Sequence, residues 1–84
     1  MIQWITVQVS AKTLLRVRYR FSEQANALLF VNGKRRLESL SYQPSGRVEL
    51  TLREIPKGAV VALVARDLAG NLSKRRVLKL SVHR

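Results

Sequence analysis

The fold of this chain is decided by the stretch VVALVARDLAGN at residues 60–71. It is the longest apolar run in the sequence, and it ends abruptly in a turn. Because its first six residues are apolar at odd and even positions alike, a strand here would be buried on both faces. Gly70 and Asn71 tolerate a positive φ and therefore predict a tight reversal. We expect a central strand followed by its outgoing turn.

Outward from this stretch, several segments alternate between apolar and polar residues, which is the pattern of a half-buried strand. They are 2–10, 13–21, 47–54 and 75–83. The clearest is 13–21, where one face is apolar and the other carries three arginines. The apolar side chains are Leu15, Val17, Tyr19 and Phe21, and the arginines are Arg16, Arg18 and Arg20.

A further segment, 27–31, is apolar throughout and is followed by Asn32-Gly33, which predicts a two-residue type I′ hairpin. Leu37 and Leu40 anchor the return segment, and polar connections are expected at 22–26 and 41–46. These segments make about seven short strands, with turn signals every ~8–12 residues and no helical periodicity. The sequence therefore predicts an all-β fold, a two-sheet antiparallel β-sandwich that fills residues 1–84 as a single domain.

The charge of the chain is strongly positive. Sixteen Lys and Arg against five Asp and Glu give a formal net charge of +11. Such a charge favours an acidic partner, which could be nucleic acid, an anionic membrane or an acidic protein surface. A solvated arginine-rich surface that only keeps the protein soluble is the alternative.

The sequence also bears on location. It contains no cysteine, which fits a reducing compartment. We expect no signal peptide at the start, and no apolar segment approaches the ~20 residues of a membrane helix. The expectation is a protein made in the cytoplasm, or a domain cut from a longer secreted protein.

Residues 65–73, ARDLAGNLS, resemble a motif of the bacterial immunoglobulin-like domains, which are close in shape to fibronectin type III modules. In that family the penultimate strand ends in Ala-x-Asp-x-Ala-Gly-Asn-x-Ser. Phe21-Ser22-Glu23 followed by Val31-Asn32-Gly33 matches a second motif of the same group. The resemblance covers nearly the whole chain and implies an immunoglobulin-like sandwich. It says little about function, because such modules host many roles.

The resemblance also implies which residues of the central strand face inward. Val61, Leu63 and Ala65 would face the core, and Val60, Ala62 and Val64 would face outward. Relatives are mostly neutral or acidic outside, whereas this chain is rich in arginine, so a typical secreted adhesin-repeat role does not carry over directly.

Catalytic groups are scarce. His83 is the only histidine, and Asp67 is the only aspartate, which we expect to hydrogen-bond the turn backbone. Glu23, Glu38, Glu49 and Glu54 show no paired spacing. We therefore expect no enzyme, no cofactor, no metal site and no small-molecule substrate.

Two surfaces remain as candidates for binding. The first is basic and would meet an acidic partner or nucleic acid; its residues are Arg16, Arg18, Arg20, Arg47, Arg53, Lys34, Arg35 and Arg36. The second is an exposed apolar patch for a protein partner or a second copy of the chain; its residues are Val60, Ala62, Val64, Leu28, Phe30 and Val77. A loop or the 34–40 segment folding over this patch is the alternative.

The leading functional prediction is a structural or assembly module that docks by the apolar patch. By analogy with the resemblance, it would be a virion accessory or decoration protein of the kind phage particles carry, or a module of a larger surface protein. The other prediction is a nucleic-acid-binding protein that uses the arginine-rich face. Base stacking needs exposed aromatic residues beside the basic groove, and Trp4 and Tyr42 are the candidates. Trp4 could equally pack over the end of the domain.

Overall fold

The computed structural model describes residues 2–10, 13–39 and 42–78. These residues form six strands and one short 3-10 turn. The strands are β1 Ile2–Ser10, β2 Leu14–Val31, β3 Lys34–Glu38, β4 Gln43–Thr51, β5 Val61–Asp67 and β6 Arg76–Leu78, and the turn η1 is Leu52–Glu54. Leu40 and the end of the expected last strand, with Leu80, Val82 and His83, lie outside the described residues.

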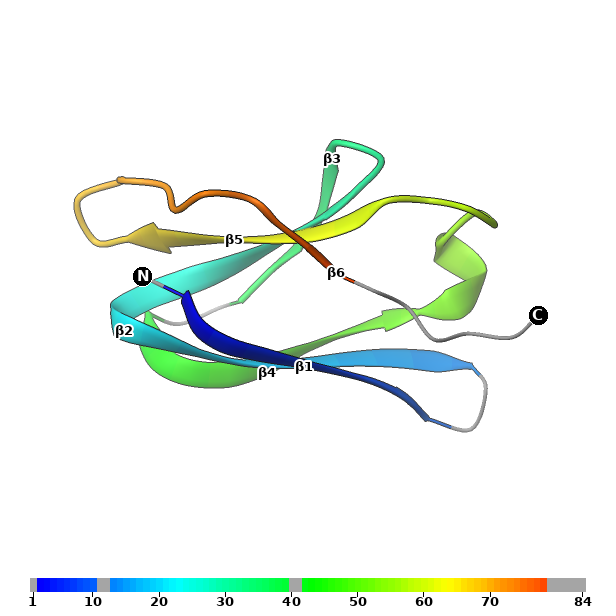
Figure 1. The fold of residues 1–84 in the computed structure, drawn as a ribbon, viewed down its shortest axis with the longest axis horizontal. Helices are drawn as coiled ribbons and strands as arrows, with labels where there is room; N and C mark the ends of the chain where they lie inside the picture. The colour runs from blue at the N-terminus through cyan, green and yellow to red at the C-terminus, as the bar shows by residue number, and fades with distance from the viewer. Residues whose placement is uncertain (1, 11–12, 40–41, 79–84) are drawn as a thin grey trace.

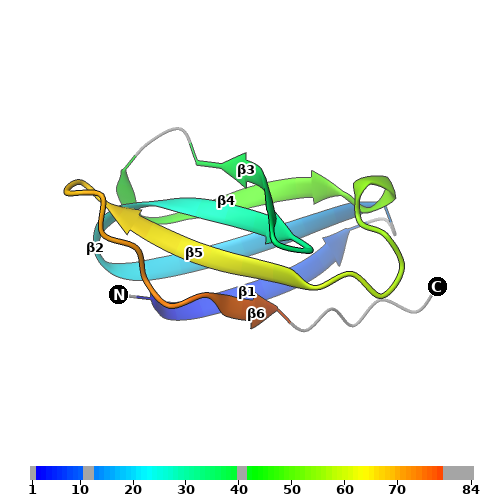
Figure 2. The ribbon, with the colours of Figure 1, turned by 90° about the horizontal axis from the view of Figure 1, so that it is seen from above.

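Strand β2 organises the molecule, because every strand except β6 pairs with it. Residues 14–20 of β2 lie between β1 and β4, and residues 28–31 lie between β3 and β5. All pairings are antiparallel, and β6 adds to the free edge of β5. The result is one all-β sheet that curls so that its two halves face each other (Figure 1). Seen from above, β3, β2, β5 and β6 lie side by side (Figure 2).

The sequence prediction was wrong at two connections. Residues 22–26 belong to β2, so the strands expected at 13–21 and 27–31 are one continuous strand. The pairing with β4 shifts register between Arg20 and Ala25, where β2 passes from one half of the sheet to the other. The second connection was predicted at 41–46, but residues 43–46 form the first part of strand β4.

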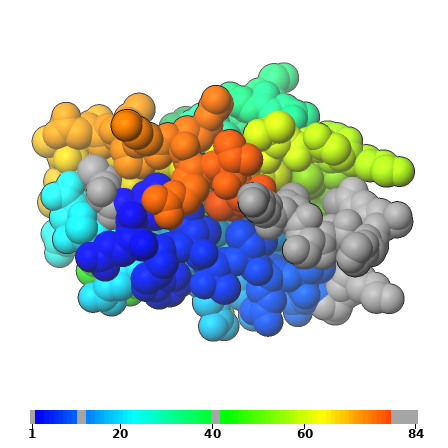
Figure 3. All heavy atoms as spheres, viewed as in Figure 1, coloured from blue at the N-terminus to red at the C-terminus, as the bar shows by residue number. Residues whose placement is uncertain are grey.

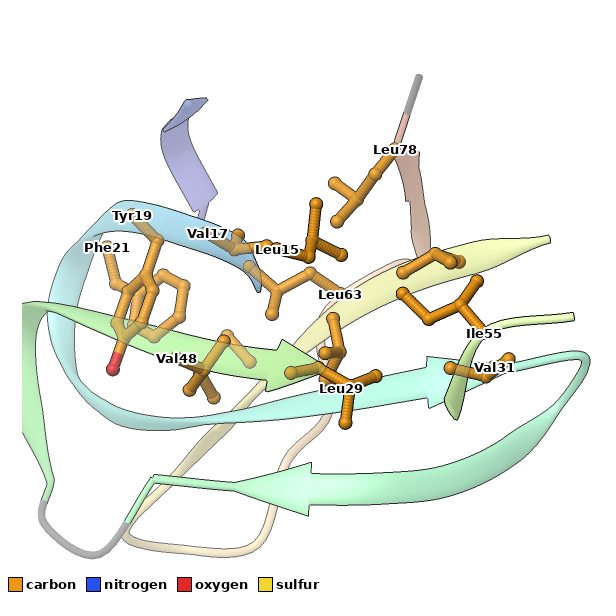
Figure 4. Packing of buried hydrophobic residues seen from close by; sticks show 14 of the residues in the cluster. Leu15, Val17, Tyr19, Phe21, Leu29, Val31, Val48, Ile55, Leu63 and Leu78 are labelled. Atoms are coloured by element: carbon orange, nitrogen blue, oxygen red, sulfur yellow. The ribbon is translucent and has the colours of Figure 1, made fainter. Parts of the chain in front are cut away.

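The core fills the space between the two halves of the curled sheet (Figure 4). The expected inward residues of 13–21 all belong to it, and so do Val61, Leu63 and Ala65 of β5, which confirms the predicted alternation. The rings of Tyr19 and Phe21 are stacked, with centroids 4.6 Å apart and planes 22° apart. Leu78 of β6 packs into the same cluster. Strands β1 and β6, which end the pairing order β1-β2-β5-β6, both lie on the face drawn in Figure 3, in blue and orange.

The hairpin between β2 and β3 confirms the Asn32-Gly33 prediction. Both residues have a positive φ, 51° and 82°, which a type I′ turn requires. The side-chain Oδ1 of Asn32 also accepts a hydrogen bond from the Val60 N–H at 2.9 Å, and the Asn32 N–H donates to the Val60 carbonyl at 2.8 Å. The turn therefore holds the start of β5 as well as its own strands.

The turn after β5 is closed by Asp67, as the sequence predicted. Its Oδ1 accepts hydrogen bonds from the N–H groups of Ala69 and Asn71, at 3.0 and 2.8 Å, and its Oδ2 accepts one from Asn71 Nδ2 at 3.1 Å. These bonds to the ionised carboxylate lower the pKa of Asp67, those from Asn71 most of all. Gly70 supplies the positive φ of 87°. The Ser73 N–H donates to the Ala65 carbonyl, and the Ala65 N–H donates to the Ser73 hydroxyl oxygen. These two bonds fix where the chain leaves the turn.

Across the described ranges, no helix is long and apolar enough to cross a membrane. The same part of the chain holds no group of three or more histidine, cysteine or acidic side chains that could bind a metal ion.

Candidate functional site

The outward face of β1, β2 and β4 is built from three cross-strand rows. Because Leu15, Val17 and Tyr19 point into the core, their neighbours in β2 point away from it. The register places one residue of β1 and one of β4 beside each of these neighbours. The rows are Trp4–Arg20–Ser45, Thr6–Arg18–Arg47 and Gln8–Arg16–Glu49.

Arg16 is neutralised within its row. Its Nε donates to Glu49 Oε2 at 2.9 Å, and both side chains are partly exposed. Such a pair contributes about 0.2–1 kcal/mol to stability, because solvent screens it. Its main effect here is to remove Arg16 from the charge that is free to meet a partner.

The charges of Arg18, Arg20 and Arg47 are not neutralised by a described acidic side chain. All three are exposed, and none forms a salt bridge with another described residue. Arg18 lies directly opposite Arg47 on the neighbouring strand. Like charges in that position repel each other, so the free protein carries an unfavourable contact that a bound anion would relieve.

A shallow depression of about 380 Å³ lies among these arginines. Its lining is Trp4, Arg18, Tyr19, Arg20, Ser45, Gly46 and Arg47. Trp4 is 45% exposed, so part of its side chain is accessible at the rim. The face therefore offers three cations, one exposed aromatic ring and a serine hydroxyl within one hollow.

Gly46 lines this hollow and, on its core side, lies close to the ring of Tyr19. A Cβ at position 46 would lie 2.7 Å from the hydroxyl oxygen of Tyr19 and 3.2 Å from its Cζ. Tyr19 is almost fully buried and stacked on Phe21, so its ring has little room to move away. Gly46 is required here for close approach, and the aromatic ring in turn covers the bare strand.

The remaining basic residues predicted for this face lie elsewhere. Arg53 is exposed in η1, beyond the end of β4. Lys34, Arg35 and Arg36 belong to β3 in the other half of the sheet, and Arg36 Nη2 lies 3.5 Å from Glu54 Oε1. The structure thus brings together Arg16, Arg18, Arg20 and Arg47, and separates the other four from them.

The apolar patch predicted on the other half of the sheet is largely buried. Val60 and Val77 are exposed, at 51% and 57%, and Phe30 is half-buried. Leu28, Ala62 and Val64 are only 4%, 2% and 7% exposed, so the expectation that they are open to a partner was wrong.

An ion pair joins the strands on either side of β2 in this half of the sheet. Arg66 Nη2 of β5 lies 3.1 Å from Glu38 Oε2 of β3, so the pair spans β2, which runs between those two strands. Glu38 is the register partner of Leu28, which itself faces Val64. Small Ala62 lies between its larger register partners Phe30 and Val77.

The sequence pattern singles out Trp4 but does not place it beside the arginines. The signal was present in the short turn between 2–10 and 13–21: pairing Ser10 with Leu14 brings Trp4 opposite Arg20. Comparisons of the chain with protein-family models, with curated proteins and with solved structures find no match. The resemblance to immunoglobulin-like domains therefore rests on the motif residues quoted above.

Proposed function

We propose that this chain is a non-catalytic nucleic-acid-binding domain whose binding surface is the outward face of β1, β2 and β4. The observation that carries the proposal is the hollow in which exposed Trp4 adjoins Arg18, Arg20 and Arg47, three cations without an acidic partner among the described residues. A basic groove beside an aromatic ring is what sequence-tolerant binding of nucleic acid uses.

We further propose that the fold is an immunoglobulin-like sandwich close to fibronectin type III modules. The division of strands supports this: β1 and β4 flank one half of β2, and β3 and β5 flank the other half. If the two halves of β2 are counted as separate strands, the described residues supply the about seven strands typical of such a sandwich.

Electrostatics should govern the binding. A protein that neutralises phosphates with arginine releases counterions, so its affinity falls steeply as salt rises. The net charge of +11 supplies long-range attraction, and the hollow supplies the place where the charge is not already paired.

The test is a titration of a fluorescein-labelled oligonucleotide at several salt concentrations, followed by anisotropy. Arg18→Glu combined with Arg47→Glu should abolish binding at low salt. Arg35→Glu combined with Arg53→Glu is the matched control, because it changes the net charge equally at exposed positions off the face. Equal losses in both double variants, or no binding by the wild type at low salt, would contradict the proposal.

A second candidate function is the protein-docking module. The observation that favours it is that Phe30, Val60 and Val77 still border buried Ala62 with exposed or half-exposed apolar surface. In this case the wild type would self-associate in sedimentation velocity, and Val77→Asp would dissociate it without unfolding it. A wild type that sediments as a monomer at high concentration would remove self-association as a function.

A further inference from the structure

The depression on the arginine face has the size and composition of a subsite for one nucleotide. Its volume of about 380 Å³ falls at the lower end of the range for ligand pockets, roughly 300–1,000 Å³. It is open and shallow in form, with an aromatic ring at one end and arginines along its length. This inference rests on the proposed function and specifies the form of nucleic acid bound.

Two adjacent rows of the sheet divide the subsite into an aromatic end and an anionic end. Trp4 and Arg20 are register partners in one row, and Arg18 and Arg47 are partners in the next. Successive outward residues of a strand lie about 7 Å apart. The sugar of a single nucleotide can span that separation, with its base on the indole and its phosphate at the paired arginines.

The anionic end is the better defined of the two. Arg18 and Arg47 face each other across neighbouring strands, and no described acid pairs with either. A phosphate placed between them would accept hydrogen bonds from both guanidinium groups and cancel their mutual repulsion. Ser45, two residues before Arg47 in β4, adds a hydroxyl that can donate or accept at the same rim.

The aromatic end decides between single and double strands. Trp4 is the only tryptophan of the chain and is 45% exposed. A base can stack on it only if that base is unpaired and splayed out of its own stack. A duplex would meet the arginines with its phosphates but would leave the indole unused.

We infer that the hollow between β1, β2 and β4 binds one unpaired nucleotide, with its base stacked on Trp4 and its phosphate held between Arg18 and Arg47, so that the protein prefers single-stranded nucleic acid. Recognition of this kind uses the π-face common to all bases and the phosphate common to all nucleotides. It should therefore tolerate many sequences.

The experiment compares a single-stranded oligonucleotide with its own blunt duplex at low salt, using the full chain. Anisotropy of the labelled oligonucleotide measures affinity, and the intrinsic fluorescence of Trp4 measures stacking without any added label. We expect tighter binding of the single strand and quenching of Trp4 by the single strand alone. Trp4→Ala should weaken single-strand binding on the order of tenfold, whereas Trp4→Phe should retain most of it, because phenylalanine still offers a stacking face.

The outcomes separate this inference from the proposed function. Equal affinity for both forms without quenching overturns the nucleotide subsite but leaves nucleic-acid binding intact. Displacement of the oligonucleotide by polyglutamate of matched charge, with equal potency and no role for Trp4, also overturns it and indicates an acidic protein surface as the partner. Failure to bind either nucleic acid overturns both proposals.

Discussion

The carboxylate of Asp67 shows how one residue fixes a turn. The ionised carboxylate accepts three hydrogen bonds. Two come from the backbone N–H groups of Ala69 and Asn71, and the third comes from the side-chain Nδ2 of Asn71. A protonated carboxyl accepts such bonds less well, which is why the folded state lowers the pKa of Asp67 below its ordinary value of 3.8. The turn motif of the sequence is thus explained by hydrogen bonding that is specific to an acid.

This pKa shift predicts a dependence of stability on pH. Because the folded-state pKa lies below the unfolded value, the stabilisation by Asp67 is fully present above pH 3.8 and is lost as the pH falls through the folded pKa. Asp67→Asn should therefore lower the melting temperature at neutral pH and lose this disadvantage in strong acid. Thermal unfolding of both proteins between pH 2 and 7 measures it, and a difference that stays constant with pH would contradict the assignment.

The close contact between Gly46 and Tyr19 predicts that a side chain at position 46 lowers stability. Gly46→Ala should destabilise the protein by about 1–3 kcal/mol, because the added methyl group meets the Tyr19 hydroxyl in a packed core. Tyr19→Phe removes the nearest oxygen and should rescue part of the loss. A double-mutant cycle by urea unfolding measures the coupling. If Gly46→Ala costs the same with and without the hydroxyl, the clash is not the reason for glycine at this position.

At the scale of elements, β2 could be predicted in its parts and not as a whole. Alternation found its first half and the apolar run found its second half, but Ser22–Gln24 has the composition of a loop. On either side of this segment, Arg20 pairs with Ser45 of β4 and Ala25 pairs with Asp67 of β5, and both partners are distant in sequence. Local patterns report local preference, whereas strand continuity here is a tertiary effect.

The candidate surfaces were predictable to different degrees for the same reason. Alternation alone placed Arg16, Arg18 and Arg20 on one face. The burial of Leu28 and Val64 was not predictable from alternation. Leu28 lies between Glu38 of β3 and Val64 of β5, and these pairings join segments that are distant in sequence.

The β2–β3 hairpin leads to a prediction about coupling between elements. Asn32→Gly keeps the positive φ of the turn but removes the Oδ1 that accepts from the Val60 N–H. The Val60 amide should then exchange its hydrogen faster, with little change in global stability. Asn32→Ala should cost about 1 kcal/mol more, because alanine disfavours the left-handed turn conformation. Amide exchange followed by NMR checks both, and unchanged Val60 protection in Asn32→Gly would show that the side-chain bond is not formed.

At the scale of the whole molecule, the curled sheet presents two unlike outer faces. On the β3–β2–β5–β6 half, Glu38 and Arg66 form an ion pair, and Leu28, Ala62 and Val64 are buried. On the β1–β2–β4 half, Arg18, Arg20 and Arg47 surround a hollow with no described acid to pair with. We propose that nucleic acid binds the second face and not the first.

The most direct test is a titration of the isotope-labelled protein with a single-stranded oligonucleotide, followed by amide and indole NMR shifts. We expect the largest shifts at the Trp4 indole and at the amides of the Arg18 and Arg47 row, with β3 and β5 nearly unchanged. Shifts concentrated on Lys34–Glu38 and β5, with the Trp4 indole unmoved, would contradict it.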